Sequence, residues 1–182
     1  MSSTLTDVAF DEFRANYPAK PCNAAMVNNA SELIQMTAAD GLALWEDGPG
    51  APANGVPPNI DVNPPNVRLW VVRDNDGPHA AESNPFAESL PSKVIKHSNL
   101  TGGQPAHSGG ELVFVRNDTI VINGCSGRYG PQSAAELIAV AEAFKKSGYA
   151  VWCLGYDPEA AKPHHFGDVD PVWVACAQAG LR

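Results

Sequence analysis

Residues 111–123 read Glu-Leu-Val-Phe-Val-Arg-Asn-Asp-Thr-Ile-Val-Ile-Asn, two apolar runs rich in β-branched residues on either side of a polar centre. Runs of this length and composition are typical of strands, so 111–115 and 119–123 are predicted to be strands. Asn117-Asp118 suits the tight turn of a hairpin between them. The hairpin predicts an antiparallel meander in the middle of the chain.

The segments around the hairpin add further strands. Residues 67–73 are rich in β-branched and aromatic residues, and the turn-forming sequence Asp-Asn-Asp-Gly follows at 74–77. Residues 93–100 and 149–154 are predicted as two more strands, whereas the proline-broken segment 78–92 is predicted as a loop. The sheet is therefore expected to have about five strands.

Helices are predicted toward both ends of the chain. Ser-Ala-Ala-Glu at 133–136 has the pattern of a capping box, which opens a helix that runs to Lys146 and stops at the glycine that follows Ser147. Residues 6–17 are predicted as a first helix because aromatic residues recur there at spacings of three and four. Apolar spacing also predicts helix within 23–46, with a break at Asp40-Gly41. A short helix is predicted within 170–179, after an Asp-Pro start.

Length and composition are typical of one globular domain. The chain has 182 residues, of which 44% are hydrophobic and 18% are charged, and this length is enough to bury a real core. We therefore expect a single α+β domain over residues 1–182, with N-terminal helices and one helix packed on a mainly antiparallel sheet. Six prolines and three glycines fall within 48–66, so this loop is the only candidate internal boundary.

The charge and the cysteine content of the chain argue against nucleic-acid binding and metal binding. A net charge of -8 disfavours nucleic acid as a partner, because nucleic-acid binding needs clustered lysine and arginine. The four cysteines are far apart and form no metal-binding pair, so no metal is predicted. The N-terminal residues lack the basic and apolar regions of a signal peptide, and no run is long enough for a membrane helix. We expect a cytoplasmic protein without a membrane partner, or export by a route that reads no cleaved signal.

The candidate site lies in a glycine-rich stretch, 96–131, in which polar side chains alternate with glycines. Glycine lets the backbone turn sharply and approach a ligand closely, so this pattern favours a site wall. A meander brings alternate strand ends together, and we therefore expect these polar groups to meet at one edge of the sheet. The candidate site residues are His97, Ser98, Thr101, Gly103, Glu111, Ser126, Arg128 and Tyr129.

Within residues 93–131 the blocks Lys-His-Ser-Asn-Leu at 96–100, Gly-Glu at 110–111 and Ser-Gly-Arg-Tyr-Gly-Pro at 126–131 form a motif series. The series resembles the core of plant IQ-motif calmodulin-binding proteins and of some bacterial toxin-like proteins, in which the blocks usually read Lys-His-Ser-Ser-Phe and Ser-Gly-His-Tyr-x-Pro. This chain departs from that pattern at Asn99, Leu100 and Arg128. It has no basic IQ helix, so calmodulin binding does not carry over. The resemblance implies a shared site.

The first hypothesis for this site is an effector- or toxin-like bacterial enzyme that consumes NAD, as an ADP-ribosyltransferase or an NAD glycohydrolase. The residue types are similar to those of histidine-tyrosine-glutamate transferases. His97 with Ser98 would hold the nicotinamide ribose, Tyr129 would stack on the nicotinamide, and Glu111 would stabilise the cationic sugar. Further contacts to the NAD cofactor are expected from Thr101, Gly103, Ser126 and Arg128, the last as a phosphate anchor. In such transferases the glutamate usually follows the tyrosine, whereas Glu111 precedes Tyr129.

Two alternatives stay open. A metal-independent ribonuclease would use His97 and His107 as general base and acid, with Lys96 or Arg128 holding the phosphate, because histidine titrates near neutrality. A noncatalytic binding module would use the glycine loops to hold a ligand. The expected partner is a small-molecule or protein substrate, and a toxin-like protein would also have a neutralising partner protein.

Overall fold

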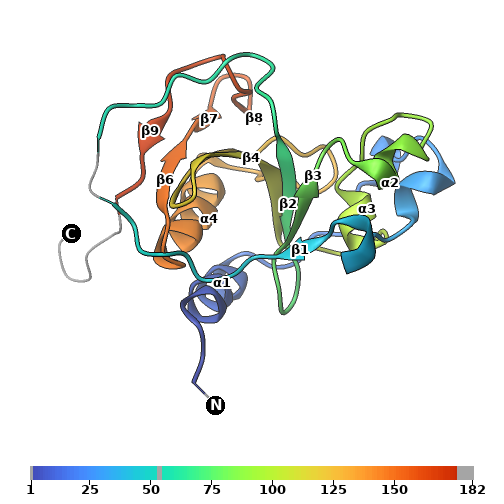
Figure 1. Cartoon of the computed structure of the whole chain (residues 1–182), viewed down its shortest axis with the longest axis horizontal. Helices are drawn as coiled ribbons and strands as arrows, with labels where there is room; N and C mark the ends of the chain where they lie inside the picture. The colour runs from blue at the N-terminus through green and yellow to red at the C-terminus, as the bar shows by residue number, and fades with distance from the viewer. Residues whose placement is uncertain (1, 53–54, 176–182) are drawn as a thin grey trace.

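A computed structural model describes residues 2–52 and 55–175 of the chain, and they form an α+β fold (Figure 1). Its centre is a sheet of seven strands in the order β1-β3-β2-β4-β5-β6-β9. Neighbouring strands are antiparallel except β5 and β6, which are parallel and are connected through helix α4. The predicted fold class, α+β with a mainly antiparallel sheet, is confirmed.

The sheet strands are β1 (Ala43–Leu44), β2 (Arg68–Val72), β3 (Pro78–Ala81), β4 (Ser108–Arg116), β5 (Thr119–Asn123), β6 (Ala150–Cys153) and β9 (Val172–Trp173). A separate two-stranded sheet contains β7 (Tyr156–Asp157) and β8 (Lys162–Pro163). The α-helices are α1 (Leu5–Asn16), α2 (Pro85–Glu88), α3 (Ser98–Thr101) and α4 (Ala134–Lys146). Three short 3-10 helices are η1 (Ala24–Met26), η2 (Ala30–Leu33) and η3 (Ala38–Asp40).

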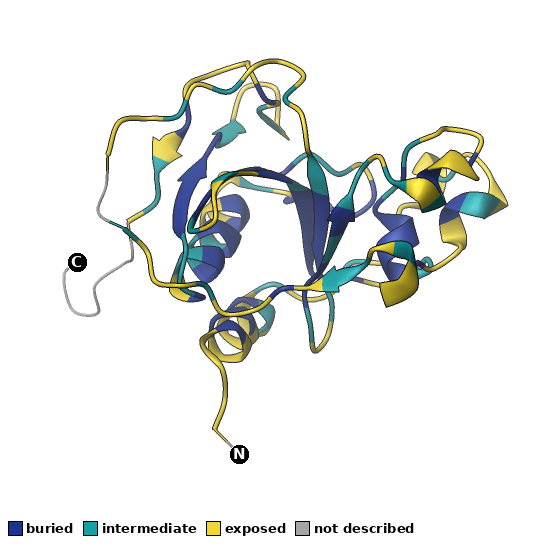
Figure 2. Ribbon diagram, in the orientation of Figure 1, coloured by how far each residue is buried: buried dark blue, intermediate teal, exposed yellow. Residues whose placement is uncertain are grey.

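Helices α1 and α4 cover one face of the sheet. Thr4 starts α1 through a capping box, in which its hydroxyl accepts a hydrogen bond from the Asp7 amide and the Asp7 carboxylate accepts one from the Thr4 amide. The helix then buries Phe10 and Phe13. Phe10, Trp45 and Trp70 meet Phe144 of α4 edge to face, and these rings join the apolar side chains of β2, β4, β5 and β6 in one core. Figure 2 shows the buried residues of α4, β2 and β6 in dark blue.

The opposite face of the sheet carries two smaller apolar clusters. One contains Leu69 and Val71 of β2, together with Ile95, Leu100 and Tyr129 from the connecting segments. The other is formed by Val113, Val121, Trp152, Leu154 and Phe166. Glu111 of β4 lies opposite Leu69 of the first cluster and two residues before Val113 of the second, and Asn123 lies opposite Glu111 in the β4–β5 register. These two polar residues therefore separate the clusters and mark the position of the candidate site.

The predicted helix within 23–46 is wrong. The segment contains η1, η2, η3 and β1 instead. Asn23 accepts a hydrogen bond from the Ala25 amide, and Asn29 accepts one from the Ser31 amide. Such local side-chain bonds offer the backbone an alternative to a continuous helix, and apolar spacing alone did not reveal them.

Two predictions about the segment before β4 are also wrong. Residues 93–100 form no strand: the Asn99 side chain accepts a hydrogen bond from the Lys96 amide, and the chain turns into the short helix α3 at Ser98. The predicted loop 78–92 contains β3, which pairs with both β1 and β2, and the short helix α2. Proline at the first residue of a strand is compatible with pairing, so Pro78 did not exclude β3.

The remaining predicted elements match more closely. Helices 6–17 and 133–146 and strands 67–73, 119–123 and 149–154 are confirmed within two residues. Strand β4 begins three residues before the predicted strand 111–115, so the predicted position of Glu111 at a strand start is wrong.

The C-terminal prediction fails in part. Residues 172–173 pair with β6 as β9, so the helix predicted within 170–179 is wrong at its beginning. Its part from 176 onward lies outside the described residues. The described part of the proline-rich segment 48–66 contains no helix or strand, and no described helix has the length and apolar character needed to cross a membrane.

Candidate functional site

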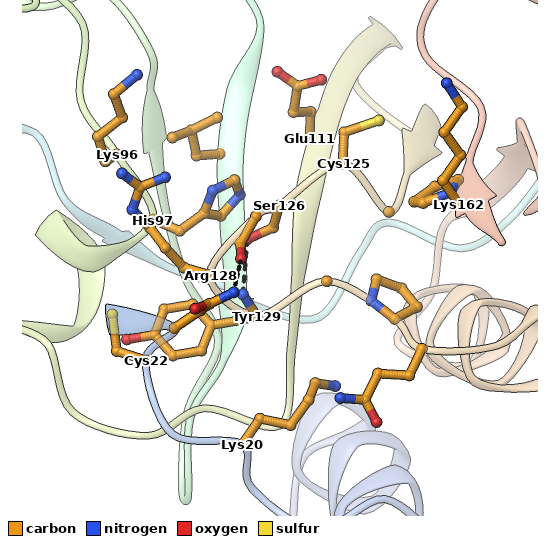
Figure 3. Close-up of a pocket in the computed structure, with 18 of the residues that line it drawn as sticks. Lys20, Cys22, Lys96, His97, Glu111, Cys125, Ser126, Arg128, Tyr129 and Lys162 are labelled. Carbon is orange, nitrogen blue, oxygen red and sulfur yellow. Dashed lines mark hydrogen bonds between the residues drawn. The ribbon is translucent and has the colours of Figure 1, made fainter. Parts of the chain in front are cut away.

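A cavity of about 890 Å³ opens on the sheet face opposite α1 and α4. Its floor is formed by Leu69 of β2 and Glu111 of β4. Its walls come from three connecting segments, 20–24, 94–97 and the glycine-rich loop 124–132 after β5. Lys162 and His165 close a further side. Figure 3 shows the side chains that meet there.

Two carboxyl groups, those of Glu82 and Glu111, meet in this cavity. Burial, the charge of Glu111 and a hydrogen bond between the two carboxyls raise the pKa of Glu82, against the opposing charge of Lys96. The Asn123 side chain fixes Glu111, since it donates to the Glu111 carboxylate and accepts from the Glu111 amide, both at 3.0 Å. The charge of a neighbouring carboxylate disfavours ionisation of Glu82, so Glu82 holds its proton to higher pH than an isolated carboxyl group. The pair is therefore suited to proton transfer.

His97 is buried beside the same floor. Its Nε2 lies 2.7 Å from the Gly110 carbonyl oxygen, so Nε2 carries the proton and donates. Burial lowers the pKa of His97 to about 4, and the charges of Arg128 and Lys96 act in the same direction. The imidazole is therefore neutral at physiological pH, which makes it a hydrogen-bonding group rather than a cation.

Arg128 is held inside the wall by residues from the segment that carries η1 and η2. Its Nη2 donates to the Met26 carbonyl oxygen at 2.6 Å and forms an ion pair with the buried carboxylate of Glu32. The Nε of Arg128 is buried and has no hydrogen-bond partner among the described residues. A buried donor without a partner is costly.

Lysines line the cavity as well. Lys20 is committed to the protein, because its Nζ contacts both the His107 carbonyl oxygen and the Glu136 carboxylate at 2.7 Å. Because the Glu136 carboxylate binds Lys20, it does not complete the predicted capping box of α4. Only the other bond of that box forms, in which the Glu136 amide donates to the Ser133 hydroxyl. Lys96 and Lys162 form no ion pair within the described part of the chain, and they lie on opposite sides of Glu111 in Figure 3.

Tyr129 belongs to the wall rather than to the open space. It is 1% exposed. Its hydroxyl contacts the Thr101 hydroxyl and the Gln104 carbonyl oxygen, both at 2.7 Å. Burial raises the pKa of Tyr129. These contacts fix the loop that carries Ser126, whose hydroxyl accepts a hydrogen bond from the Tyr129 amide.

A cysteine and a histidine meet at the edge of the cavity. Cys125 Sγ lies 3.5 Å from His165 Nδ1. Burial and the charges of Glu111 and Asp168 raise the pKa of Cys125 to about 12. The thiol is therefore protonated at neutral pH and is not an activated nucleophile. No three His, Cys, Asp or Glu side chains are grouped to hold a metal ion in the described ranges.

The chain was compared with protein-family models, with curated proteins and with solved structures. No match was found. The resemblance of residues 93–131 to IQ-motif and toxin-like proteins therefore stays a prediction. The function of the site is therefore inferred from the chemistry and geometry of its side chains alone.

Five of the eight predicted site residues line the cavity: His97, Glu111, Ser126, Arg128 and Tyr129. The other three lie behind the wall. Ser98 and Thr101 are buried in α3, and Gly103 follows its left-handed cap at Gly102. His107 is not among the lining residues, since its Nδ1 contacts the Tyr17 carbonyl oxygen at 2.6 Å. The structure therefore does not bring His97 and His107 to one cavity.

Sequence reasoning missed Glu82, Lys162 and His165. Glu82 follows β3 directly, and β3 fell in a segment predicted as loop. Its place beside Glu111 follows only from the strand order β3-β2-β4. Lys162 and His165 lie in or just after the short strand β8, for which the sequence carries no periodic signal.

Proposed function

We propose that the protein is an enzyme that consumes NAD in this cavity, as an ADP-ribosyltransferase or an NAD glycohydrolase. One observation carries the proposal: a carboxyl pair, Arg128 and two lysines without an ion-pair partner among the described residues, Lys96 and Lys162, line a single cavity of about 890 Å³. NAD carries a cationic nicotinamide ring and an anionic diphosphate. A cavity with both signs of charge is complementary to such a ligand.

The carboxyl pair would act on the nicotinamide end. Cleavage of the bond between nicotinamide and ribose leaves positive charge on the sugar, while nicotinamide departs as a neutral molecule with the bonding electrons. A carboxylate fixed beside that sugar stabilises charge that develops only in the transition state. Glu111 suits this role because Asn123 holds its orientation. Glu82 then takes up the proton of the attacking water or acceptor.

The cationic groups would hold the diphosphate. Lys96 and Lys162 have no ion-pair partner among the described residues, and the Nε of Arg128 has no acceptor there. Arginine and lysine both bind phosphate oxygens through charge-assisted hydrogen bonds. Ser126 and the glycine backbone beside it supply neutral polar contacts on the same wall.

We propose structural roles, rather than contacts to NAD, for Tyr129, Thr101 and Ser98. The Tyr129 ring packs in an apolar cluster with its hydroxyl turned to Thr101, so we propose that it positions the loop 124–130 rather than stacking on nicotinamide. Ser98 and Thr101 support that wall from α3. His97 faces the cavity as a neutral group.

Calorimetry with NAD and measurement of nicotinamide release test the proposal. For Glu111→Gln we expect retained NAD binding and release that falls by at least ~10², the effect of losing a charge-stabilising group. Glu88→Gln is the matched control, because Glu88 is exposed on α2 and does not line the cavity. No NAD binding by the wild type, or equal release by Glu111→Gln and wild type, would overturn the proposal.

A further inference from the structure

A second cavity, of about 820 Å³, adjoins the first. The two cavities share three lining residues, Glu82, Glu111 and His165. The carboxyl pair therefore stands at the junction of one continuous groove, with open space on both sides. If the donor NAD occupies the first cavity, the second lies where an acceptor would approach the same reacting carbon.

The walls of the second cavity differ from those of the first. Residues 62–67 form one side, with two adjacent prolines and two asparagines, and Phe114 and Phe166 add aromatic surface. The cation on this wall is Arg68, which is half-buried. Its Nε donates to His79 Nδ1 at 2.8 Å, and it has no ion-pair partner within residues 2–52 and 55–175. A carboxylate is the group that a guanidinium in this state pairs with best.

The backbone beside this cavity is open to a partner strand. β2 pairs with β4 only as far as Leu112, although β4 continues to Arg116. From Val113 onward, no strand of the described chain pairs with β4 on its β2 side. Phe114 lies on this stretch, is 40% exposed and lines the cavity. A free strand edge takes up extended polypeptide by adding a strand.

We propose that the second cavity is the acceptor subsite and that its acceptor is an extended acidic peptide. The peptide adds along residues 113–116 of β4, places a carboxylate on Arg68 and presents a side-chain hydroxyl to Glu82 and Glu111. This inference depends on the proposed function for its chemistry. The hydroxyl oxygen bonds to the ribose carbon, the carbon–nitrogen bond breaks with its electron pair leaving on nicotinamide, and the hydroxyl proton passes to the carboxyl pair.

The charges of the groove explain why the acidic residue and the hydroxyl are separate parts of the peptide. A carboxylate beside Glu82 and Glu111 would be repelled, whereas Arg68, whose side chain lies on the other face of the sheet from Glu111, attracts it. Arg68 lies opposite Leu112 and Glu111 lies opposite Leu69, so the side chains of Arg68 and Glu111 point to opposite faces of the sheet. Adjacent residues of an added strand also point to opposite faces, so a serine and the glutamate next to it can reach the carboxyl pair and Arg68 respectively.

Transfer and binding are tested separately on the full chain. The probes are capped heptapeptides of alanine with a central serine followed directly by glutamate, lysine or alanine. We expect the glutamate peptide to be modified at least ~10-fold faster than the lysine peptide, and Arg68→Gln to abolish that preference, because the preference depends on one charge-assisted contact. Equal modification of all three peptides by the wild type, or modification of an RNA oligonucleotide in their place, would overturn the inference.

A variant that fills the cavity is the second arm. Ser83 is exposed at the rim of the second cavity and does not line the first. Ser83→Trp is expected to reduce transfer to the peptide at least ~10-fold more than it reduces NAD hydrolysis in water, since its bulk enters only the acceptor side. Glu88→Trp, on exposed α2 surface outside both cavities, is the control. An equal loss of transfer and hydrolysis in Ser83→Trp would show that the second cavity belongs to the donor.

Binding of a fluorescein-labelled glutamate peptide separates this inference from the proposed function. We expect Ser83→Trp to weaken binding at least ~10-fold, and N-methylation of alternate peptide amides to weaken it as well, because strand addition needs those amides. Peptide binding without nicotinamide release would refute the NAD proposal and leave the peptide site standing. Nicotinamide release without peptide binding by the wild type would refute the acceptor subsite alone.

Discussion

The Glu111 carboxyl group lies close enough to Glu82 to raise its pKa, although Glu82 directly follows β3 and Glu111 lies in β4, two strands that are separated by β2. The Glu82 backbone is fixed on both sides, as its amide donates to the Val67 carbonyl at 2.9 Å and its carbonyl accepts from the Ile95 amide at 3.0 Å. Two strand spacings amount to roughly 10 Å, a gap that two glutamate side chains can close. The fold thus brings together two carboxyl groups from residues 29 positions apart.

The raised pKa of Glu82 predicts a pH dependence of stability. The folded state holds this proton above the ordinary value of 4.5, mainly because the group is buried and then because Glu111 is close. The resulting stabilisation is complete below the pKa of the unfolded chain and is lost as pH rises through the raised folded pKa. Thermal unfolding from pH 4 to 8 should show wild type losing stability relative to Glu82→Gln as pH rises. Parallel curves would show that folding does not raise the pKa of Glu82.

His97 predicts the opposite trend on acidification. Its pKa falls from 6.5 to about 4, because burial and then nearby cations disfavour the charged ring. The unfolded chain takes up a proton near 6.5 and the folded chain only near 4, so the free energy of unfolding falls as pH drops through this window. The difference corresponds to about 3 kcal/mol.

His97→Gln tests this trend, because an amide can still donate to the Gly110 carbonyl oxygen. Denaturant titrations at pH 7.5 and pH 4 should show the wild type losing about 3 kcal/mol more than the variant. His79, whose pKa is also lowered to about 4, is present in both proteins, so its contribution cancels. An equal loss in both proteins would refute the prediction.

Local patterns were enough to predict much of the fold. The hairpin of β4 and β5, the helix α4 and strand β6 have strong apolar periodicity and clear end signals, and all are present. The failures have a shared cause. In 23–46 and 93–100 the backbone is held by side chains such as Asn29 and Asn99, and these local bonds override an apolar pattern that fits helix or strand equally well.

The site was predictable only where its residues lie in glycine-rich sequence. His97, Glu111 and Arg128 were found because a polar group among glycines suggests a wall. Glu82 was not, because its role arises from strand order rather than from neighbouring residues. The sequence also does not indicate which way a side chain points. Tyr129 lies in a segment that lines the cavity, yet its hydroxyl points into the protein.

Lys96→Gln should weaken NAD binding with little effect on smaller ligands. Lys96 lines the first cavity and forms no ion pair among the described residues, so its charge is available to the diphosphate. Loss of one such contact should raise the Kd for NAD by about tenfold, in line with a charge-assisted hydrogen bond. Nicotinamide riboside, which lacks the diphosphate, is the control ligand in calorimetry. An equal effect on both ligands would argue against a phosphate contact.

Because Arg128 and Glu32 form a buried ion pair, we expect the effects of replacing these two residues on the free energy of unfolding to be strongly non-additive. Both side chains are less than a tenth exposed, so removing one partner leaves a buried charge without compensation. Arg128→Met alone should cost about 3–5 kcal/mol of unfolding free energy, and Arg128→Met with Glu32→Leu clearly less. Urea denaturation measures both.

The exposed pair of Lys146 and Glu12 provides the comparison for that experiment. Its side chains are 38% and 63% exposed, and solvent screening should limit the cost of Lys146→Met to less than about 1 kcal/mol. Additive losses at Arg128 and Glu32 would contradict the predicted coupling.

Gly110 packs tightly within the sheet, and its carbonyl oxygen accepts the hydrogen bond from His97 in the candidate site. A side chain at position 110 is therefore expected to disturb both the sheet and the site. A Cβ at this position would lie 2.1 Å from the Asn123 carbonyl oxygen and 2.7 Å from the Trp70 ring. Neither neighbour is the end of a flexible side chain, so the strand itself must shift. We expect Gly110→Ala to cost at least about 1–3 kcal/mol, as overpacking does.

The same shift should reach His97, whose Nε2 is held by the Gly110 carbonyl oxygen. Gly55→Ala is the matched control, because nothing lies within 4 Å of its Cβ position, and its effect should stay within about 0.5 kcal/mol. Urea denaturation reports the stability of both variants, and the histidine ring signals in an NMR spectrum report the position of His97. Equal stability of the two variants, with an unchanged His97 signal in Gly110→Ala, would show that β4 accommodates a side chain here and that the site does not depend on this close approach.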